Sequence, residues 1–250
     1  MGQEISDSHF TAQDFSRFLQ RLHDETGLLD DWFRRRRFSS RGDIGGFELE
    51  AWLVYADGSP APVNKDFLAY LNNPLVVPEL AAFNVELNTD PRQLEAAALT
   101  AMEDNLAATW RACQQAAQEF DAALVMVGIL PSVAEKQLSL RHMSSMARYR
   151  ALNEQVLLLR HGEPLHLHIE GQDTLSLTHH DVMLEAGTTS LQIHLQVPFE
   201  QAHRYMNAAI IASAPMVAAS ANSPYLFGHD LWAETRVPLF EQAVEVGSPK

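Results

Sequence analysis

Three segments of the chain alternate apolar and polar residues with a period of two, and this pattern constrains the fold more than any other feature. They are residues 46–55, 83–89 and 190–197, and residues 166–170 show a shorter run of the same kind. Successive side chains of a β-strand point to opposite faces, so each segment predicts a strand with one apolar and one polar face. With helical segments between them, these strands predict one α+β domain built on a largely antiparallel sheet.

Helices are predicted where apolar residues recur at three- and four-residue spacing. Thr11 and Asp14 predict a capped start for a helix over residues 11–28. The Asp90-Pro91 pair predicts the start of a long helix that extends to Phe120 and packs its apolar stripe on the sheet. Four other segments are predicted: a buried strand over 123–130, a mixed helical segment over 141–160, a loop at His179-His180 before Asp181, and a buried helix and loop over 207–225.

The charge balance of the chain argues against nucleic acids and anionic membranes as partners. Its 18 Lys and Arg residues face 32 Asp and Glu residues, which gives a formal net charge of −14. A nucleic-acid surface needs clustered basic residues. The one basic run, residues 34–37, is flanked by Asp30 and Asp31 and is interpreted as a solvated segment or an oligomer contact.

The single cysteine limits both the covalent chemistry and the compartment. Cys113 cannot form an internal disulfide, and one cysteine excludes Cys-rich metal sites, so we expect a reducing, cytoplasmic setting. Its place on the apolar stripe of the long helix predicts a packing role. The N-terminus lacks the basic and apolar regions of a secretory signal, and no segment is apolar enough for a membrane span.

The polar faces of the three strands carry the residues that suggest chemistry. If the apolar faces pack under the long helix, these polar faces converge on one cleft. Carboxylates gathered there would repel one another unless cations neutralise them, and oxygen ligands with one imidazole suit Mg²⁺ or Mn²⁺. The alternative is a one-sided sheet whose polar face meets only solvent. The polar-face residues are Glu48, Glu50, Asn84, Glu86, Asn88, Gln192, His194 and Gln196.

Six motifs in a fixed order go beyond periodicity. They are GFELE at 46–50, ELAAFNVELNT at 79–89, RYRALN at 148–153, TSLQIH at 189–194, ANSP at 221–224 and LWAETR at 231–236. Together they resemble the glutamate–cysteine ligase family of the carboxylate-amine ligase type, from about residue 45 to residue 242. The resemblance implies a glutamine-synthetase-like catalytic fold, in which a curved antiparallel sheet forms a funnel with ATP at one end and glutamate at the other.

The resemblance also implies roles for particular residues. Arg236 and Arg148 are the implied catalytic arginines, which would clamp phosphate or a substrate carboxylate. Arg236 is also expected to bind the nucleotide, together with Gln192 and Gln196. His166 and His168 match no ligand position and are interpreted as polar-face residues. The implied metal ligands are Glu48, Glu50, Glu79, Glu86 and His194, of which Glu79 precedes its strand and has a solvated loop position as the alternative.

The implied reaction is ATP-dependent amide formation between the γ-carboxylate of glutamate and the amine of cysteine, the first step of glutathione synthesis. Family members continue well beyond the position of Lys250 and supply a late metal-binding glutamate, so we expect a fragment of a longer ligase or a short form. The alternatives are an inactive nucleotide- and metal-binding form, a ligase with another amine acceptor, and a metal-dependent hydrolase. We expect one catalytic domain over residues 1–250, with a helical lead-in over 1–44. The expected partners are small-molecule substrates, and a homo-oligomer is a further possibility.

Overall fold

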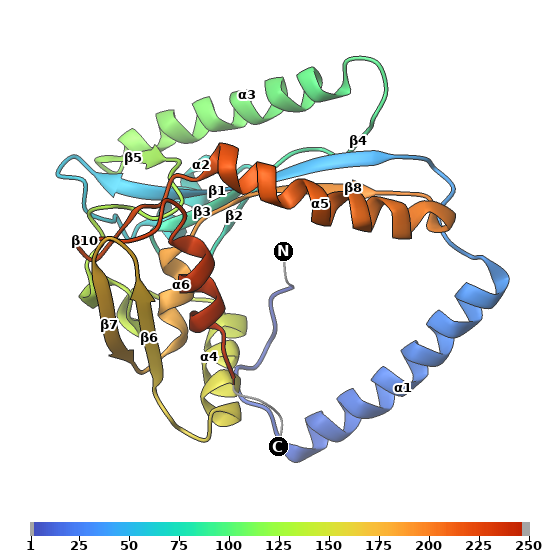
Figure 1. The fold of residues 1–250 in the computed structure, drawn as a ribbon, viewed down its shortest axis with the longest axis horizontal. Helices are drawn as coiled ribbons and strands as arrows, with labels where there is room; N and C mark the ends of the chain where they lie inside the picture. The colour runs from blue at the N-terminus through green and yellow to red at the C-terminus, as the bar shows by residue number, and fades with distance from the viewer. Residues whose placement is uncertain (1–2, 247–250) are drawn as a thin grey trace.

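The computed structural model describes residues 3–246, in which helices and an antiparallel sheet form an α+β arrangement. Within this range no helix combines the length and apolarity that a bilayer crossing needs. The main sheet is centred on β1 (Ile44–Tyr55), the longest strand (Figure 1). Because β1 is long, it pairs with two different strands along each of its edges. The other strands of this sheet are β2 (Val76–Pro78), β3 (Asn84–Asn88), β4 (Arg92–Gln93), β5 (Ala122–Val125) and β8 (Leu191–Gln196).

Every ladder of the main sheet is antiparallel, as predicted. On one edge of β1, Glu50 lies opposite Glu86 of β3, and β2 pairs with the far side of β3. On the other edge, β8 places His194 opposite Gly46, while β5 pairs with the C-terminal part of β1. The three alternating segments therefore lie side by side, with β1 in the middle, and their polar residues share one face.

The apolar face of the sheet packs against α2 (Asn64–Leu71) and α3 (Ala98–Gln118), which lies across it in Figure 1. Leu53, Phe67 and Leu87 are fully buried in this layer. Cys113 is also fully buried there, and burial raises the pKa of its thiol to about 12, so the predicted packing role is confirmed.

A second hydrophobic core closes one end of the polar face. Trp52 of β1 stacks on Phe83 with ring centroids 5.4 Å apart, and both are fully buried. Buried residues of a separate hairpin and of short helices complete this core, which lies at the end of β1 where Trp52 projects. The elements concerned are α4 (Ala147–Leu159), β6 (Leu165–Glu170), β7 (Thr174–His179), η3 (Val182–Gly187) and α6 (Arg236–Ala243).

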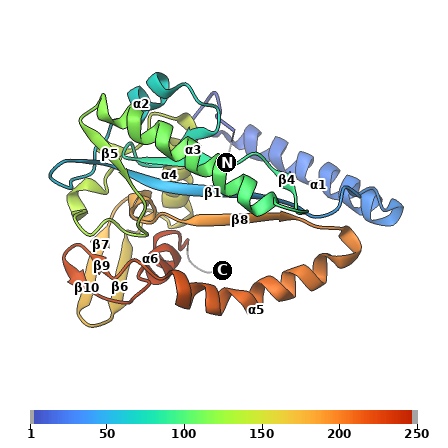
Figure 2. The same cartoon turned by 90° about the horizontal axis from the view of Figure 1, so that it is seen from above.

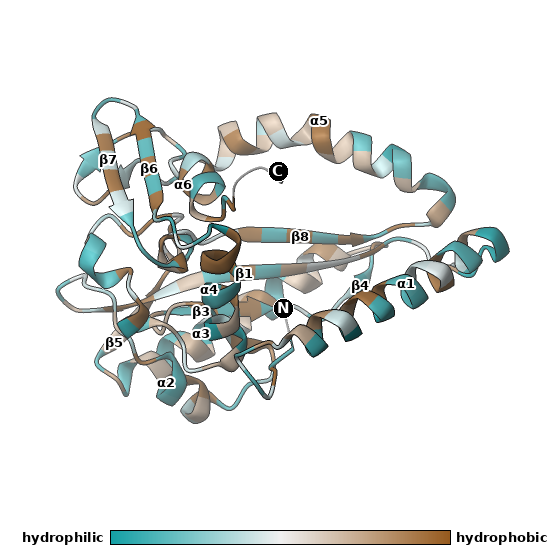
Figure 3. Cartoon of the chain, turned by 90° about the horizontal axis from the view of Figure 1, so that it is seen from below, coloured by the Kyte–Doolittle hydropathy of each residue, from teal (hydrophilic) through white to brown (hydrophobic). Residues whose placement is uncertain are grey.

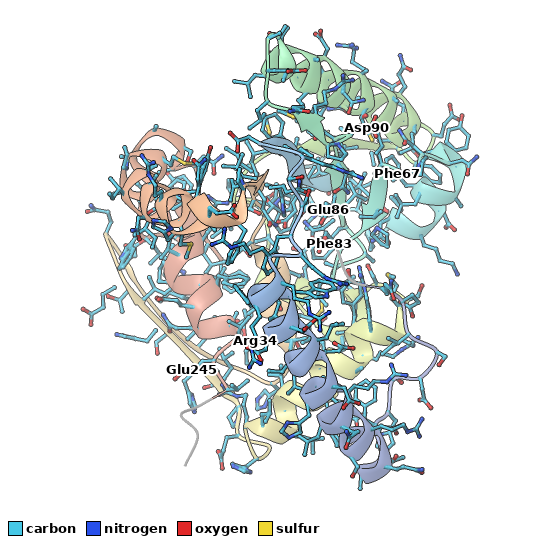
Figure 4. All side chains as sticks on the ribbon, turned by 90° about the vertical axis from the view of Figure 1, so that its right-hand side faces the viewer. Arg34, Phe67, Phe83, Glu86, Asp90 and Glu245 are labelled. Atoms are coloured by element: carbon cyan, nitrogen blue, oxygen red, sulfur yellow. The ribbon has the colours of Figure 1, made fainter. Side chains whose placement is uncertain are left out.

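The remaining elements described here are an N-terminal helix and several short elements. α1 (Ala12–Arg35) begins with the predicted capping box of Thr11 and Asp14, and none of its residues is buried. Arg34, which is labelled in Figure 4, lies on this exposed helix. Its guanidinium forms an ion pair with Asp30, as expected of a solvated segment. The short elements are η1 (Glu135–Gln137), η2 (Leu140–His142), η4 (Phe199–Gln201), β9 (Tyr225–Leu226) and β10 (His229–Asp230).

Two sequence predictions about α5 (Ala202–Ser220) and β8 are wrong. The apolar helix over 207–225 was expected to be buried, yet α5 has no buried residue, and Ile211 is 76% exposed. α5 lies beside β8, on the side away from β1, and not over a sheet face (Figures 2 and 3). Because α3 covers β1 and β3 but not β8, the apolar face of β8 also stays open, with Ile193 50% exposed.

Three local predictions also fail for physical reasons. The long helix begins at Ala98 and not at Asp90-Pro91, because β4 first extends the pairing with the start of β1. The apolar run over 123–130 ends as a strand at Val125, where its pairing with β1 ends at Trp52. His179 does not lie in a loop: it ends β7 and is buried, with its Nε2 2.8 Å from the Asp181 carboxylate. The helical part of 141–160 is η2 followed by α4.

Candidate active site

A pocket of about 380 Å³ lies where the polar sheet face meets the second core. Five parts of the chain line it: β1, the segment between β2 and β3, the start of β3, the region from η3 into β8, and α6. The polar lining residues are Glu50, Glu79, Asn84, Glu185, Thr188, Thr189, Ser190, Gln192 and Arg236, and the apolar ones are Leu80, Ala81, Ala186 and Phe240.

Glu50 projects from the middle of β1 into this pocket. The backbone N–H of Ser190 donates to one oxygen of its carboxylate at 2.8 Å, and Gln192 Nε2 donates to the other at 3.4 Å. Burial raises the pKa of Glu50, and the charge of Glu86 adds to this, while the bonds from Ser190 and Gln192 act against it. The carboxylate of Glu50 is therefore fixed by hydrogen bonds, while burial and the neighbouring charge disfavour its ionised form.

Glu79 follows β2 and is partly buried in the pocket wall. Burial raises the pKa of its carboxyl to about 8, and the negative charges of Glu50 and Glu86 contribute. A hydrogen bond between Glu79 and Glu86 also favours the protonated form of Glu79. The structure therefore places Glu79 in the pocket wall and not in a solvated loop, next to the two carboxylates that the sequence placed on the polar face.

Glu185 is a pocket residue that the sequence reasoning missed. Burial raises the pKa of its carboxyl, and the charge of Glu50 raises it further. Glu185 lies on η3, whose residues Val182, Met183 and Leu184 are buried. A lone acidic residue at the end of an apolar run was the available signal, because charged residues are rarely placed in buried segments without a reason.

Arg236 is held in the pocket by a buried network. Its Nε donates to the carboxylate of Glu234, which is 6% exposed, and its Nη1 donates to the carbonyl of Thr189 at 2.6 Å. Glu234 also accepts from Ser223 Oγ at 3.0 Å. A Cβ at Gly128 would lie 2.7 Å from Arg236 Cδ, so this glycine leaves the room that the arginine needs.

Arg148 does not line the pocket but supports a segment that does. Its Nη2 donates to the carbonyl of Pro78 at 3.4 Å and lies 2.6 Å from Tyr149 Oη. The Tyr149 hydroxyl donates to the same carbonyl at 3.1 Å. Because Pro78 directly precedes Glu79, both side chains help to fix the backbone at that glutamate. The expected catalytic role of Arg148 stays a prediction.

The other predicted site residues lie further along the polar face. Glu48 is 5% exposed, and its carboxylate lies 3.2 Å from Nε2 of His194, whose side chain is 47% exposed. Gln196 Nε2 donates to Ser39 Oγ at 3.2 Å, and Gln196 does not line the pocket. Gln192 lies at the pocket beside Glu50. Glu86 lies on the sheet near Phe83 (Figure 4), and one of its oxygens accepts from Asn88 Nδ2 at 2.8 Å.

Comparison with known protein families shows which family the chain belongs to. The family model described as glutamate-cysteine ligase family 2 matches residues 44–248. The chain belongs to glutamate-cysteine ligase family 2. A search of curated proteins finds no match. Membership of this family points to a ligase-type enzyme of the carboxylate-amine kind.

The five metal ligands implied for this family 2 chain fall into two groups. Glu50, Glu79 and Glu86 crowd one another at the inner end of the polar face, and Glu48 pairs with His194 at the outer end. As the side chains of residues 3–246 stand, no three His, Cys, Asp or Glu residues are arranged to hold a metal ion. The donor chemistry still fits a hard divalent cation, because a cation would offset the negative charges of Glu50 and Glu86 that, together with the larger effect of burial, raise the pKa of Glu79. The metal roles of these five residues stay predictions.

Proposed function

We propose that the chain is an ATP-dependent ligase that joins the γ-carboxylate of glutamate to an amine, with cysteine as the expected acceptor. One observation carries the proposal: in a family 2 chain, Glu50 and Glu79 share a pocket with a rigidly held Arg236. The antiparallel sheet with one polar face supports a glutamine-synthetase-like catalytic fold. The product with cysteine is γ-glutamylcysteine, as in the first step of glutathione synthesis.

The reaction has two bond-forming steps. An oxygen of the glutamate γ-carboxylate attacks the γ-phosphorus of ATP, and the bond to ADP breaks. This first step yields an acyl phosphate. The amine nitrogen then attacks its carbonyl carbon, phosphate leaves with the electron pair of the C–O bond, and the nitrogen gives up a proton. Phosphoryl transfer depends mainly on positioning and on neutralising charge, so the pocket needs fixed charged groups more than a covalent catalyst.

The residues of the pocket divide this work. Arg236, fixed by Glu234 and Thr189, holds an anionic group of a substrate through its guanidinium. Glu50, Glu79 and Glu86, with Glu48 and His194 further out, would hold Mg²⁺ or Mn²⁺. When bound, the cation supplies charge neutralisation for the phosphates. Gln192 beside Glu50 orients that carboxylate, and nucleotide contacts of Gln192 and Gln196 remain part of the proposal.

ADP formation tests the proposal. The purified chain is supplied with Mg²⁺, ATP and glutamate, with and without cysteine, and the product is identified by mass. Cysteine-dependent ADP release with a matching γ-glutamyl product supports the proposal. ADP release that needs no amine indicates a hydrolase, and binding of ATP without turnover indicates an inactive binding form. Other small amines in place of cysteine test the choice of acceptor.

A further inference from the structure

Two polar side chains in the pocket have no role in the proposed function. Asn84 lies on β3 and is 3% exposed, and both its Nδ2 and its Oδ1 are buried without a hydrogen-bond partner among residues 3–246. Glu185 lines the same pocket, and within the described chain its carboxylate receives neither a hydrogen bond nor a salt bridge. The family resemblance assigns no role to either residue.

A buried amide with neither group satisfied is unusual. Nearly all buried polar side chains in native proteins have a partner, because an unmade hydrogen bond in a low-dielectric interior costs the full desolvation of the group. Neighbouring amides in this protein follow the rule: Asn64, which is equally buried, donates to the carbonyls of Ala81 and Asn84 and to Ser144 Oγ. The exception at Asn84 lies in the wall of the pocket, so a ligand is the natural partner.

The unsatisfied groups define the chemistry of that ligand. The amide of Asn84 needs both a donor and an acceptor, and the carboxylate of Glu185 needs a cationic donor. Arg236 offers the same pocket a cation for an anionic group. An α-amino acid carries an ammonium group and a carboxylate on one carbon, which matches this set. Leu80, Ala186 and Phe240 line the pocket beside them and suit the methylene groups of a side chain.

The size of the pocket agrees with a small ligand. Its volume of about 380 Å³ lies at the lower end of the range for ligand sites, which is roughly 300–1,000 Å³. The pocket therefore has room for an amino acid.

We infer that Asn84 and Glu185 form the subsite for the α-ammonium group of an amino-acid substrate, whose α-carboxylate is held by Arg236. Glu185 accepts a hydrogen bond from the ammonium group, and Asn84 Oδ1 accepts a second one. Asn84 Nδ2 donates to the α-carboxylate. The inference rests on the proposed function for the identity of this amino acid, glutamate, whose γ-carboxylate is then directed toward Glu50 and Glu79.

A pair of ligands that differ only in the amino group tests this inference. Glutamate and glutarate carry the same two carboxylates, and glutarate lacks the α-amino group. Their dissociation constants are measured by calorimetry in the presence of Mg²⁺ for the wild-type chain and for Glu185→Gln. The matched control is Glu135→Gln, an exposed glutamate on another 3₁₀ helix, η1.

We expect the wild-type chain and the control to bind glutamate at least roughly tenfold more tightly than glutarate, as a charged hydrogen bond predicts. Glu185→Gln should bring that ratio close to one by weakening glutamate binding while leaving glutarate binding unchanged. Asn84→Ala should reduce the ratio by a smaller factor. The unfolding temperature of each variant confirms that it is folded, and the isosteric Glu185→Gln gives a result even if Asn84→Ala does not fold.

Three results would overturn the inference: a wild-type chain without preference for glutamate, an unchanged ratio in Glu185→Gln, or a loss of Mn²⁺ binding by Glu185→Gln in the absence of any amino acid. The last result would make Glu185 a metal ligand. ATP turnover is measured separately on the same samples. A ratio that collapses in Glu185→Gln supports the inference even if the wild-type chain releases no ADP, and turnover with an unchanged ratio rejects the inference alone.

Discussion

β3 and β8 both pair with β1, one on each of its edges. They have the same alternating sequence pattern, but their surroundings are opposite. In β3 the apolar residues Val85 and Leu87 are fully buried under α3, and Glu86 on the polar face is 2% exposed. In β8 the apolar residue Leu191 is 54% exposed, and the polar residue His194 is nearly half exposed. The period of two thus predicts a strand and its two faces. Whether each face is buried depends on which other elements pack against it.

This difference also divides the chemistry of the polar face. On the β3 side, carboxylates are removed from water and crowd one another, and the pKa of Glu79 rises to about 8. On the β8 side, the buried carboxylate of Glu48 lies 3.2 Å from the imidazole of His194, whose side chain is nearly half exposed. A site that must concentrate positive charge on phosphates and carboxylates is favoured where water is excluded, and we place it at the β3 side.

The largest expected contrast between the two flanks is in stability. Leu87→Ala removes a fully buried side chain from the layer under α3 and should lower the free energy of unfolding by about 2–5 kcal/mol. Leu195→Ala, at a position of β8 that is 50% exposed, should change it by about 0.5 kcal/mol or less. Urea unfolding of the two variants measures both values. Similar losses at the two positions would show that β8 is covered in solution.

A smaller effect is expected from the crowded carboxylates, and it depends on pH. The pKa of Glu79 is higher in the folded protein, about 8, than its ordinary value of 4.5, so folding favours the protonated form. In the metal-free protein this group therefore destabilises the fold progressively as the pH rises from about 5 to 8. Glu79→Gln, which stays neutral, should raise the unfolding temperature by a few degrees at pH 8.5 and much less at pH 5.

Thermal unfolding in the presence of a chelator checks this pH dependence. Glu103→Gln, at an exposed position of α3, is the control for the loss of one negative charge. An equal change at both pH values in Glu79→Gln would contradict the raised pKa, and with it the burial and the charge crowding that cause it.

The smallest expected effect is at the outer pair. His194→Ala removes the imidazole beside the buried carboxylate of Glu48. Because that imidazole is nearly half exposed, water can take its place, so the loss of stability should be about 1 kcal/mol or less. Urea unfolding at neutral pH measures it. A loss of several kcal/mol would mean that water does not replace the imidazole beside Glu48.

The sequence was sufficient to predict what is local and periodic. The three strands, the antiparallel ladders, the cap at Thr11 and the packing role of Cys113 follow from spacing and from residue type. The ordered motifs also indicated the family that the comparison with known families shows. The spacing signals are carried by residues close to one another in the chain, and the family signal by the order of six motifs along it.

What the sequence did not predict depends on contacts between distant elements. The exposure of α5 and of the apolar face of β8 depends on what packs against them, and their apolar content predicted the opposite. Glu185 enters the pocket because η3 packs against the second core, and Glu234 matters because it fixes Arg236. No spacing within one element carries that information.

The turnover of Glu50→Gln is the most direct test, because Glu50 is the carboxylate that the strand pattern, the family motif and the pocket have in common. ADP release and γ-glutamyl product are measured with Mg²⁺, ATP, glutamate and cysteine, with Glu103→Gln as the folded control. Glu50→Gln should lose at least roughly 100-fold in turnover, the scale of losing a group that stabilises charge in the transition state, and the control should keep full activity. Unchanged turnover in Glu50→Gln would contradict this expectation and would move the active site away from this pocket.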